Sequence, residues 1–351
     1  MPDPRTPVTH TDTVSVFFGD AIAILPQLEA CSVDAIVTDP PYGLGFCDQD
    51  WDGATGFRES LHDVDTSGMS DADVFEAWCH AWAAGALHVL KPGGHLVAFG
   101  GTRTWHRLVC GVEAAGFEIR DQIAWLYSTG MPKSMDLSRA VDQHFDAVRA
   151  DRVVEVADHD GLLGRTRKVI DQGQPVTVQA KALQGWGLGL KPGFEPIMVA
   201  RKPPEGSLVT NVLTCGVGGL HIDAARFADG SWPVNVTLDE GQGEAVDAAT
   251  GSVGETVFGK FPVFRYDGKA SQGERPKAFG VAHTTVKPVS LMRWLINLVT
   301  PVGGTVLEPF AGSGSTIEAG LLAGFQVVAI EKDPTCLPLI QSRLDRLSES
   351  V

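Results

Sequence analysis

The sequence predicts an α/β fold built on a mostly parallel sheet with helices on both faces. Runs rich in β-branched residues alternate with helical patterns toward both ends of the chain, and several runs finish in a glycine or an acid. Such alternation is typical of βαβ units, in which a helix connects two parallel strands. Open sheets of this kind bind ligands at the carboxyl ends of their strands. We therefore expect a functional site where these glycines and acids gather.

The first part of the chain alternates strand and helix as far as residue 127. Helical spacing is clearest over residues 71–90, where Asp71 and Asp73 suit the first turn because the helix dipole favours negative charge there. The segment KPGG (91–94) is expected to form a turn. In order, we expect strand VSVFF, helix AIAILPQLEA broken at its proline, strand VDAIV, helix 71–90, strand HLVAFGG, helix RTWHRLVCGVEAAGF ended by Gly116, and strand FEIRDQIAWLY.

The last part of the chain repeats the pattern, whereas the middle is less regular. The middle is rich in Gly and Pro, and residues 239–256 read as a loop. In the last part we expect helix SLMRWLINLVT, strand TVLEPF, the glycine-rich turn AGSGST, helix IEAGLLAGF, strand QVVAIE and a final helix, PTCLPLIQSRLDRL.

Composition indicates a globular enzyme of the cytoplasm. The 351 residues are 44% hydrophobic, yet no apolar run reaches the roughly 18 residues that suggest a membrane span. The N-terminal stretch is polar and proline-rich, which does not fit a secretory signal. Six cysteines are scattered without a CxxC pair, and the histidines lack metal-ligand spacing. We therefore expect reduced thiols, no metal site and no membrane partner.

The distribution of charge indicates which region could meet a polyanion. The net charge of −15 disfavours nucleic acid as a partner when taken alone. Residues 1–130, however, hold 6 basic against 18 acidic side chains, whereas residues 131–280 hold 17 against 19. The nearly neutral middle carries most of the basic residues. If a polyanion binds, we expect the middle to contact it.

Two strand exits carry unusual residues. In LEPFAGSGST a strand-type run reaches Glu308 and then Gly312 and Gly314, and the next strand ends at Glu331. Glycines let a ligand approach the backbone closely, and an acid at the next strand end can bind ribose hydroxyls. In TDPPY a buried strand ends in Asp39, two prolines and Tyr42. Each motif by itself is equally compatible with a tight turn.

Together the motifs resemble the DNA amino-methyltransferases that use S-adenosylmethionine. TDPPY comes first, EPFAGSGST comes last and HTTVKP lies between them, an order that resembles the β class of this family. The resemblance implies a seven-stranded Rossmann-like methyltransferase sheet, circularly permuted, with an inserted target-recognition region. The final helix would feed the VSVFF strand in an unpermuted chain, so the termini should lie close together. It implies a discontinuous catalytic domain of residues 14–127, 190–202 and 283–349, with insertions at 128–189 and 203–282 for DNA contact.

The resemblance also implies site residues. Asp39 and the Pro40 carbonyl would accept hydrogen bonds from the target amine, Pro40 and Pro41 would fix that geometry, and the Tyr42 ring would stack on the flipped base. HTTVKP has Thr284 where the family usually has Pro, and Glu308 stands where Asp is common. The segment EPIMVAR resembles the family's antiparallel strand. The cofactor would contact Asp20, Thr285, Lys287, Glu308, Phe310, Gly312, Gly314 and Glu331, Phe46 would line the pocket of the base, and Lys133 would contact a phosphate unless it is a solvated surface residue. By charge, and not by the resemblance, Arg165, Arg167 and Lys168 are the best local candidates for a DNA backbone contact, with a solvated loop as the alternative.

The implied reaction is methyl transfer from S-adenosylmethionine to adenine N6 in double-stranded DNA, with cytosine N4 as the alternative base. No cysteine follows a proline, so the nucleophile motif of cytosine-C5 enzymes is absent from the sequence. A non-catalytic DNA- or cofactor-binding module with this fold, and an enzyme acting on RNA, are further alternatives. A homodimer and a cognate restriction nuclease are compatible partners. Trp78 and Trp82, four residues apart, are expected to pack in the core.

The basic cluster RTRK (165–168) gives a first prediction. Each lost phosphate contact should reduce the slope of log affinity against log salt by about 0.9, because fewer counterions are released. Replacing Arg165, Arg167 and Lys168 by Gln should therefore flatten the slope for duplex DNA in a fluorescence-anisotropy titration. Arg5→Gln, in the polar N-terminal stretch, serves as the control. An unchanged slope in the triple variant would move the DNA contacts elsewhere in residues 128–282.

Overall fold

The computed structural model describes residues 6–45, 50–127, 134–150, 152–157, 166–171, 173–226, 230, 232–238, 265–271, 273–278, 281–283 and 285–349. The chain forms two compact units. One unit comprises residues 1–128 and 194–351, and the other comprises residues 129–193. The described residues between 203 and 282 therefore belong to the unit that holds the sheet.

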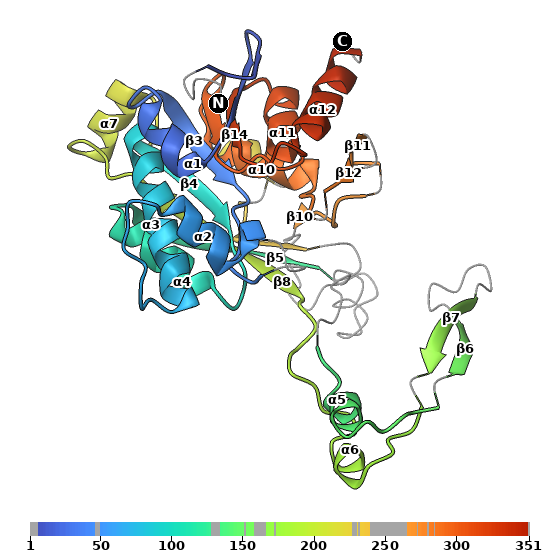
Figure 1. The fold of residues 1–351 in the computed structure, drawn as a ribbon. Coiled ribbons are helices and arrows are strands. Elements are labelled where there is room, and N and C mark those ends of the chain that lie inside the picture. The colour runs from blue at the N-terminus through green and yellow to red at the C-terminus, as the bar shows by residue number, and fades with distance from the viewer. Residues whose placement is uncertain are drawn as a thin grey trace. The chain divides into compact units, whose positions relative to one another are not determined.

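The first unit is built on a mixed sheet, in which ten strands are described (Figure 1). Seven central strands run β2-β14-β13-β3-β4-β8-β5, and the short strands β1, β9 and β10 extend the two edges. The expected Rossmann-like methyltransferase sheet is thus confirmed. The strands are β1 (Thr9–His10), β2 (Val14–Phe18), β3 (Val33–Thr38), β4 (Leu90–Phe99), β5 (Glu118–Leu126), β8 (Phe194–Arg201), β9 (Val236–Leu238), β10 (Arg265–Tyr266), β13 (Thr305–Glu308) and β14 (Gln326–Glu331).

Strand direction divides the sheet. Strands β2, β14, β13, β3 and β4 pair in parallel, whereas β8 pairs antiparallel with both β4 and β5. The strand EPIMVAR therefore returns antiparallel, as the resemblance implies. Five parallel strands in a row place their carboxyl ends at one edge of the sheet.

Segments near the two ends of the chain lie side by side at one edge of the sheet. Strand β2 pairs in parallel with β14, so the first and the last long strands are neighbours. Val8 and Thr9 line a surface cleft together with Leu337 and Gln341 of α12 (Leu337–Glu349), the final helix. This adjacency agrees with the circular permutation that the motif order implies.

Helices cover both faces of the sheet because alternate strand residues point to opposite sides. In β3, Ile36 belongs to one apolar cluster, whereas Ala35 and Val37 belong to the other. The first cluster contains Trp78 and Trp82, both buried as expected. The first face is covered by α1 (Ala21–Ile24), α2 (Ala54–Ser60), α3 (Asp71–Val89) and α4 (Trp105–Ala114), and the other by α8 (Ile222–Ala225), α10 (Val289–Val299) and α11 (Ser315–Leu322).

Most expected helix limits agree with the structure, but the KPGG turn is wrong. Helix α3 begins after the cap Ser70 and has both Asp71 and Asp73 in its first turn. Residues 91–94 lie inside β4, which follows α3 without a loop. Gly93 adopts a φ of +80° and donates its N–H to the Lys202 carbonyl, so the chain bends while it stays paired. A glycine in the left-handed region can form an irregular strand as well as a turn.

In its described residues, the second unit contains two helices and a hairpin. Helices α5 (Leu137–His144) and α6 (Val178–Ala182) pack together, and β6 (Arg152–Ala157) pairs antiparallel with β7 (Thr166–Asp171). Asp142 is buried and accepts hydrogen bonds from the Val176 N–H, the Thr177 N–H and the Arg149 Nε. Burial alone would raise the pKa of Asp142, but these donors hold it well below its usual value.

Two further features complete the architecture. Helix α7 (Leu208–Cys215) lies in the first unit, and β11 (Lys277–Ala278) pairs with β12 (Val281–Ala282) as a separate short hairpin. Within the described ranges, every helix is too short or too polar to cross a bilayer.

The Asp142 cluster gives a prediction for the second unit. Asp142→Asn should increase amide exchange at Val176 and Thr177, because the amide nitrogen of Asn cannot accept the hydrogen bonds that the carboxylate accepts. Hydrogen exchange followed by mass spectrometry measures this change. Asp146→Asn, at an exposed position with a φ of +52°, is the matched control. Equal exchange in the two variants would show that the cluster does not hold the unit together.

Candidate active site

Four acids gather at the carboxyl ends of the parallel strands. Asp20 follows β2, Asp39 follows β3, Glu308 ends β13 and Glu331 ends β14. The strands β2, β14, β13 and β3 are adjacent in the sheet. The two sequence motifs, although about 270 residues apart, therefore lie at the same sheet edge.

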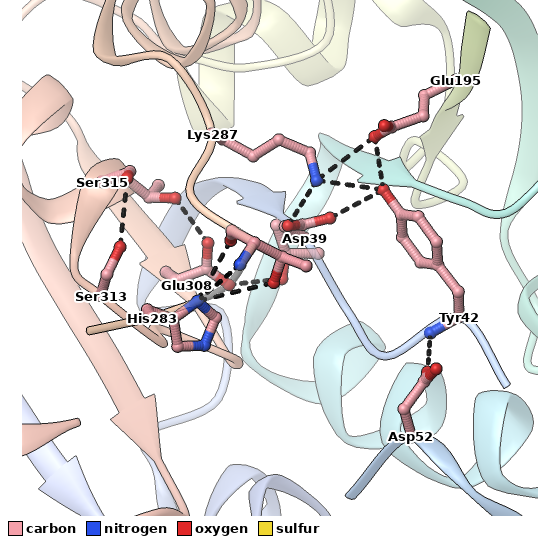
Figure 2. Close-up of polar contacts among 12 residues, drawn as sticks. Asp39, Tyr42, Asp52, Glu195, His283, Lys287, Glu308, Ser313 and Ser315 are labelled. Carbon is pink, nitrogen blue, oxygen red and sulfur yellow. Dashed lines mark hydrogen bonds and ion pairs between the residues drawn. The ribbon is translucent and has the colours of Figure 1, made fainter. Parts of the chain in front are cut away.

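At the exit of β3, Asp39 belongs to a polar network of four side chains (Figure 2). The Lys287 Nζ lies 2.6 Å from Asp39 Oδ2 and 3.3 Å from Glu195 Oε2. The Tyr42 hydroxyl lies 3.0 Å from Asp39 Oδ1, 2.9 Å from Glu195 Oε2 and 3.1 Å from Lys287 Nζ. One ammonium therefore lies between two carboxylates, and the single proton of the Tyr42 hydroxyl can be donated to either of them.

Asp52 holds the backbone of the TDPPY turn by hydrogen bonds, and the sequence did not indicate this residue. Its buried carboxylate accepts the N–H of Tyr42 at 2.6 Å and that of Gly43 at 2.8 Å. The Thr104 hydroxyl donates to the Tyr42 carbonyl at 2.5 Å. These contacts fix the backbone of the turn, so Asp39 and Tyr42 lie on a loop that is held by hydrogen bonds.

Burial and charge act against each other in the network. Burial raises the pKa of Asp39 above its usual value, although Lys287 opposes the shift. Burial also acts to lower the pKa of Lys287, but the two carboxylates outweigh it and raise that pKa. The pKa of Glu195 is lowered, since Lys287 and the Tyr42 hydroxyl overcome the effect of burial. Lys287 is therefore charged, and Glu195 is the more firmly ionised of the two acids.

The glycine turn lies against Glu331. Gly312 and Gly314 have φ values of +50° and +81°, which favour glycine. The Gly312 N–H donates to Glu331 Oε2 at 2.5 Å, and the Asp333 N–H donates to Oε1 at 2.6 Å. Burial raises the pKa of Glu331 to about 7. A Cβ on Gly312 would lie 3.3 Å from His283 Nε2, so a side chain there would fill the space above the turn.

Glu308 faces the protein interior. It accepts the hydroxyls of Thr38 and Thr316, the latter at 2.6 Å, and the Phe310 N–H at 3.0 Å. These donors come from β3, α11 and the glycine turn, so Glu308 joins three elements. Burial raises its pKa to about 8 despite these hydrogen bonds.

The structure places the other expected cofactor residues as follows. Asp20 caps α1 and forms an ion pair with Lys332 at 2.9 Å. The Phe310 ring packs on Trp78, with centroids 5.3 Å apart. The Thr285 N–H donates to His283 Nδ1 at 3.3 Å. Lys287, expected at the cofactor's carboxylate, is paired with Asp39 and Glu195. The structure thus brings these side chains to one sheet edge, and their roles toward the cofactor stay predictions.

Several expected substrate contacts fall where the structure gives no side chains. Phe46, Lys133 and Arg165 lie outside the described residues, as does Thr284, the departure from the family's pattern in HTTVKP. Arg167 and Lys168 lie in β7, paired with Val156 and Glu155, and only their backbone is described.

Arg343 supports the glycine turn and is a second residue that sequence reasoning missed. This arginine of α12 is buried, and its Nε donates to the Ser313 carbonyl at 2.7 Å. Its Nη2 donates to Ser315 Oγ at 3.1 Å, and the guanidinium pairs with Glu318 of α11. An arginine among the apolar positions of an amphipathic helix was the available signal.

Comparison with known proteins decides the family. The model of the N6_N4_Mtase family, described as DNA methylase, matches residues 33–342. The chain belongs to this family of DNA methylases. It is 24% identical over 353 residues to the type II methyltransferase M.HindIII of Haemophilus influenzae, and the match covers 94% of each chain.

Other similarities extend over less of the sequence or concern the fold. Over 121 residues the methylase is 29% identical to the type II methyltransferase M.HpaI of Haemophilus parainfluenzae, which covers 34% of each chain. The structure of PvuII DNA methyltransferase (cytosine-N4-specific) superposes with a TM-score of 0.54 at 14% identity, covering 98% of this chain and 93% of that one. This superposition shows the shared fold.

The buried acid Glu308 makes stability depend on pH. Its folded pKa of about 8 lies above the ordinary 4.5, so its protonated form is favoured by folding. The stabilisation is present below about pH 4.5 and is lost as the pH rises through about 8. Glu308→Gln should therefore lose less of its free energy of unfolding between about pH 6 and about pH 9 than the unsubstituted protein, in urea titrations.

The exposed Glu29→Gln variant is the control and should follow the unsubstituted protein. Parallel losses in all three proteins would contradict the assignment of this pH dependence to Glu308.

Proposed function

We propose that this DNA methylase transfers a methyl group from S-adenosylmethionine to N6 of an adenine flipped out of double-stranded DNA. The observation that carries the proposal is the position of Asp39. Its carboxylate lies on a hydrogen-bonded turn, at the same sheet edge as the glycine turn and Glu331. The carboxylate can accept from an amine, and the glycine turn lets a nucleoside cofactor approach the backbone.

The amine needs acceptors because its lone pair is delocalised into the base. Asp39 accepts one amine N–H and the Pro40 carbonyl accepts the other, which draws the nitrogen toward sp³ geometry and localises the lone pair. Pro40 and Pro41 have locked φ angles, so this geometry exists before the base arrives. S-adenosylmethionine supplies, when bound, an electrophilic methyl group on its sulfonium sulfur.

The residues present fit such a cofactor. Gly312 and Gly314 leave space that a side chain would occupy, and Glu331 is held by the N–H of Gly312, beside that space. We assign Glu331 to the ribose hydroxyls, Asp20 to the adenine end and Thr285 with Lys287 to the carboxylate. Glu308 and Phe310 contribute by holding the turn, since their described contacts are with the protein interior.

Tyr42 has two functions in this proposal. Its ring offers a surface on which the flipped base stacks, which stabilises by roughly 1–3 kcal/mol per base. Its hydroxyl belongs to the network with Asp39, Glu195 and Lys287, so it also fixes the acceptor carboxylate. The earlier expectation concerned the ring alone, and the hydroxyl contacts add a function in positioning.

The DNA contacts are assigned to the two segments inserted between the catalytic parts. Residues 128–189 and 203–282 hold half of the 28 Lys and Arg side chains, including Arg167 and Lys168 of the hairpin strand β7. Several relatives are type II methyltransferases, which supports a modification activity paired with a restriction nuclease. A homodimer is compatible with this activity.

The base is identified by product analysis. The protein is incubated with duplex DNA of mixed sequence and methyl-labelled S-adenosylmethionine, and the digested nucleosides are separated. Label in N6-methyldeoxyadenosine supports the proposal. Label in N4-methyldeoxycytidine would assign the reaction to the alternative base, and absence of label in DNA would contradict the function.

The glycine turn gives the cofactor prediction. Gly312→Val should abolish binding of S-adenosylmethionine in calorimetry, because the side chain fills the space beside His283. Gly324→Val is the matched control: its φ is +80°, so it bears similar backbone strain, but a Cβ there meets nothing within 4 Å. A folded Gly312→Val protein with unchanged affinity would refute this placement of the cofactor.

The TDPPY turn gives a prediction that separates chemistry from base extrusion. Asp39→Ala should block methyl transfer while cofactor binding persists, whereas Tyr42→Ala should mainly weaken the hold on the flipped base. A target opposite a mismatch costs less to extrude. Such a substrate should restore part of the activity of Tyr42→Ala and none of that of Asp39→Ala. Equal rescue of both variants would show that the functions are assigned wrongly.

A further inference from the structure

Glu195 lies at the start of β8, one strand beyond β4, and its side chain is 16% exposed. It accepts the Tyr42 hydroxyl at 2.9 Å and lies 3.3 Å from the Lys287 ammonium. The Tyr127 hydroxyl also bonds to it, and Lys269 lies near enough to stabilise its charge. The Glu195 carboxylate thus lies among donors from Tyr42, Lys287 and Tyr127, although no sequence motif indicated this residue.

Both carboxylate oxygens of Asp39 already lie beside a donor in the structure. Its Oδ2 binds the Lys287 ammonium at 2.6 Å, and its Oδ1 binds the Tyr42 hydroxyl at 3.0 Å. Figure 2 shows the Lys287 ammonium and the Tyr42 hydroxyl beside the two Asp39 oxygens. A target amine that donates to Asp39 competes with these donors for the carboxylate.

Releasing the ammonium is costly unless another anion receives it. Lys287 is buried, and a buried charge without a partner is strongly destabilising. Glu195 is already 3.3 Å from Nζ and shares the Tyr42 hydroxyl, so a small shift transfers both donors to it. After that shift Lys287 is still paired, and Asp39 presents a free oxygen.

We propose that Glu195 is a positioning residue for methyl transfer: it holds Lys287 and the Tyr42 hydroxyl so that the Asp39 carboxylate can accept the target amine. This inference rests on the proposed function. It assigns to Glu195 no contact with the base or the cofactor. Its effect passes through Lys287 and Tyr42, and its loss leaves Lys287 with Asp39 as its remaining acidic partner in the network.

The test compares Glu195→Gln with the matched control Glu118→Gln. Glu118 lies on the neighbouring strand β5 and pairs with Arg201, so its replacement also removes a paired carboxylate from these two strands, but at the end opposite Glu195. Binding of S-adenosylmethionine is measured by calorimetry, folding by thermal unfolding, and methyl transfer by single-turnover kinetics on plasmid DNA. Glu195→Gln should fold and bind the cofactor within about threefold of the unsubstituted protein, but transfer the methyl group about 10- to 100-fold more slowly.

The pH profile distinguishes positioning from packing. Asp39 must be ionised to accept the amine, so the rate falls as the pH drops through its pKa. The charge of Glu195 raises that pKa, and its removal should shift the acid limb of the Glu195→Gln profile to lower pH. Glu195→Asp, which keeps the charge, should recover part of the rate and leave the limb in place. The charged and titratable groups that face Asp39 are Lys287, Glu195, Tyr42, His283 and Glu308, and those that face Glu195 also include Tyr127 and Lys269.

A second variant tests the route through Lys287. If Glu195 acts by holding the ammonium, the losses in Glu195→Gln and Lys287→Met should not add, and the double variant should be no slower than the slower single variant. Because Lys287 is also assigned to the carboxylate of S-adenosylmethionine, the rates are compared at cofactor concentrations that saturate each variant. Additive losses would contradict the inference.

Other outcomes of these experiments would also overturn the inference about Glu195. A Glu195→Gln protein with an unchanged rate and profile would overturn the inference, as would a rate that falls only in step with thermal stability while the acid limb stays fixed. In both cases the unsubstituted protein still methylates DNA, and the proposed function stands. If the unsubstituted protein transfers no methyl group to DNA, the proposed function fails, and the inference fails with it.

Discussion

The candidate site depends on one buried ammonium shared between two carboxylates. Lys287 comes from the segment before α10, Asp39 from the exit of β3 and Glu195 from the start of β8, so the ion pairs join three separate parts of the chain. The two carboxylates raise the pKa of Lys287 and keep it ionised although it is buried.

The sheet explains why such distant residues meet. In the described residues, strand order brings β3 beside β13, which in turn pairs with β14, so the TDPPY and glycine motifs share one edge even though they lie near opposite ends of the sequence. Glu308 and Arg343 then stabilise this edge from the interior, by holding Thr316 and the Ser313 carbonyl. The glycine turn is therefore positioned by buried polar contacts, as well as by its own left-handed backbone.

Periodicity in the sequence predicted the long parallel strands and the core positions of Trp78 and Trp82. The antiparallel EPIMVAR strand was implied by the family resemblance, and short strands such as β1, β9 and β10 were not predicted. The sequence did not indicate Asp52 or Glu195, because their partners are backbone amides or side chains far away in the sequence. It placed KPGG in a turn, since glycine with proline marks a break and only the pairing with Lys202 shows that the strand continues. Long-range polar contacts were thus the part that local patterns could not supply.

The most direct measurement is a crystal structure of the protein with duplex DNA and a non-reactive analogue of S-adenosylmethionine. The account predicts a flipped base whose exocyclic nitrogen lies about 3 Å from an Asp39 carboxylate oxygen and from the Pro40 carbonyl, with the Lys287 ammonium moved off Asp39. A base that stays stacked in the duplex, or that is flipped while Lys287 still occupies Asp39, would contradict it.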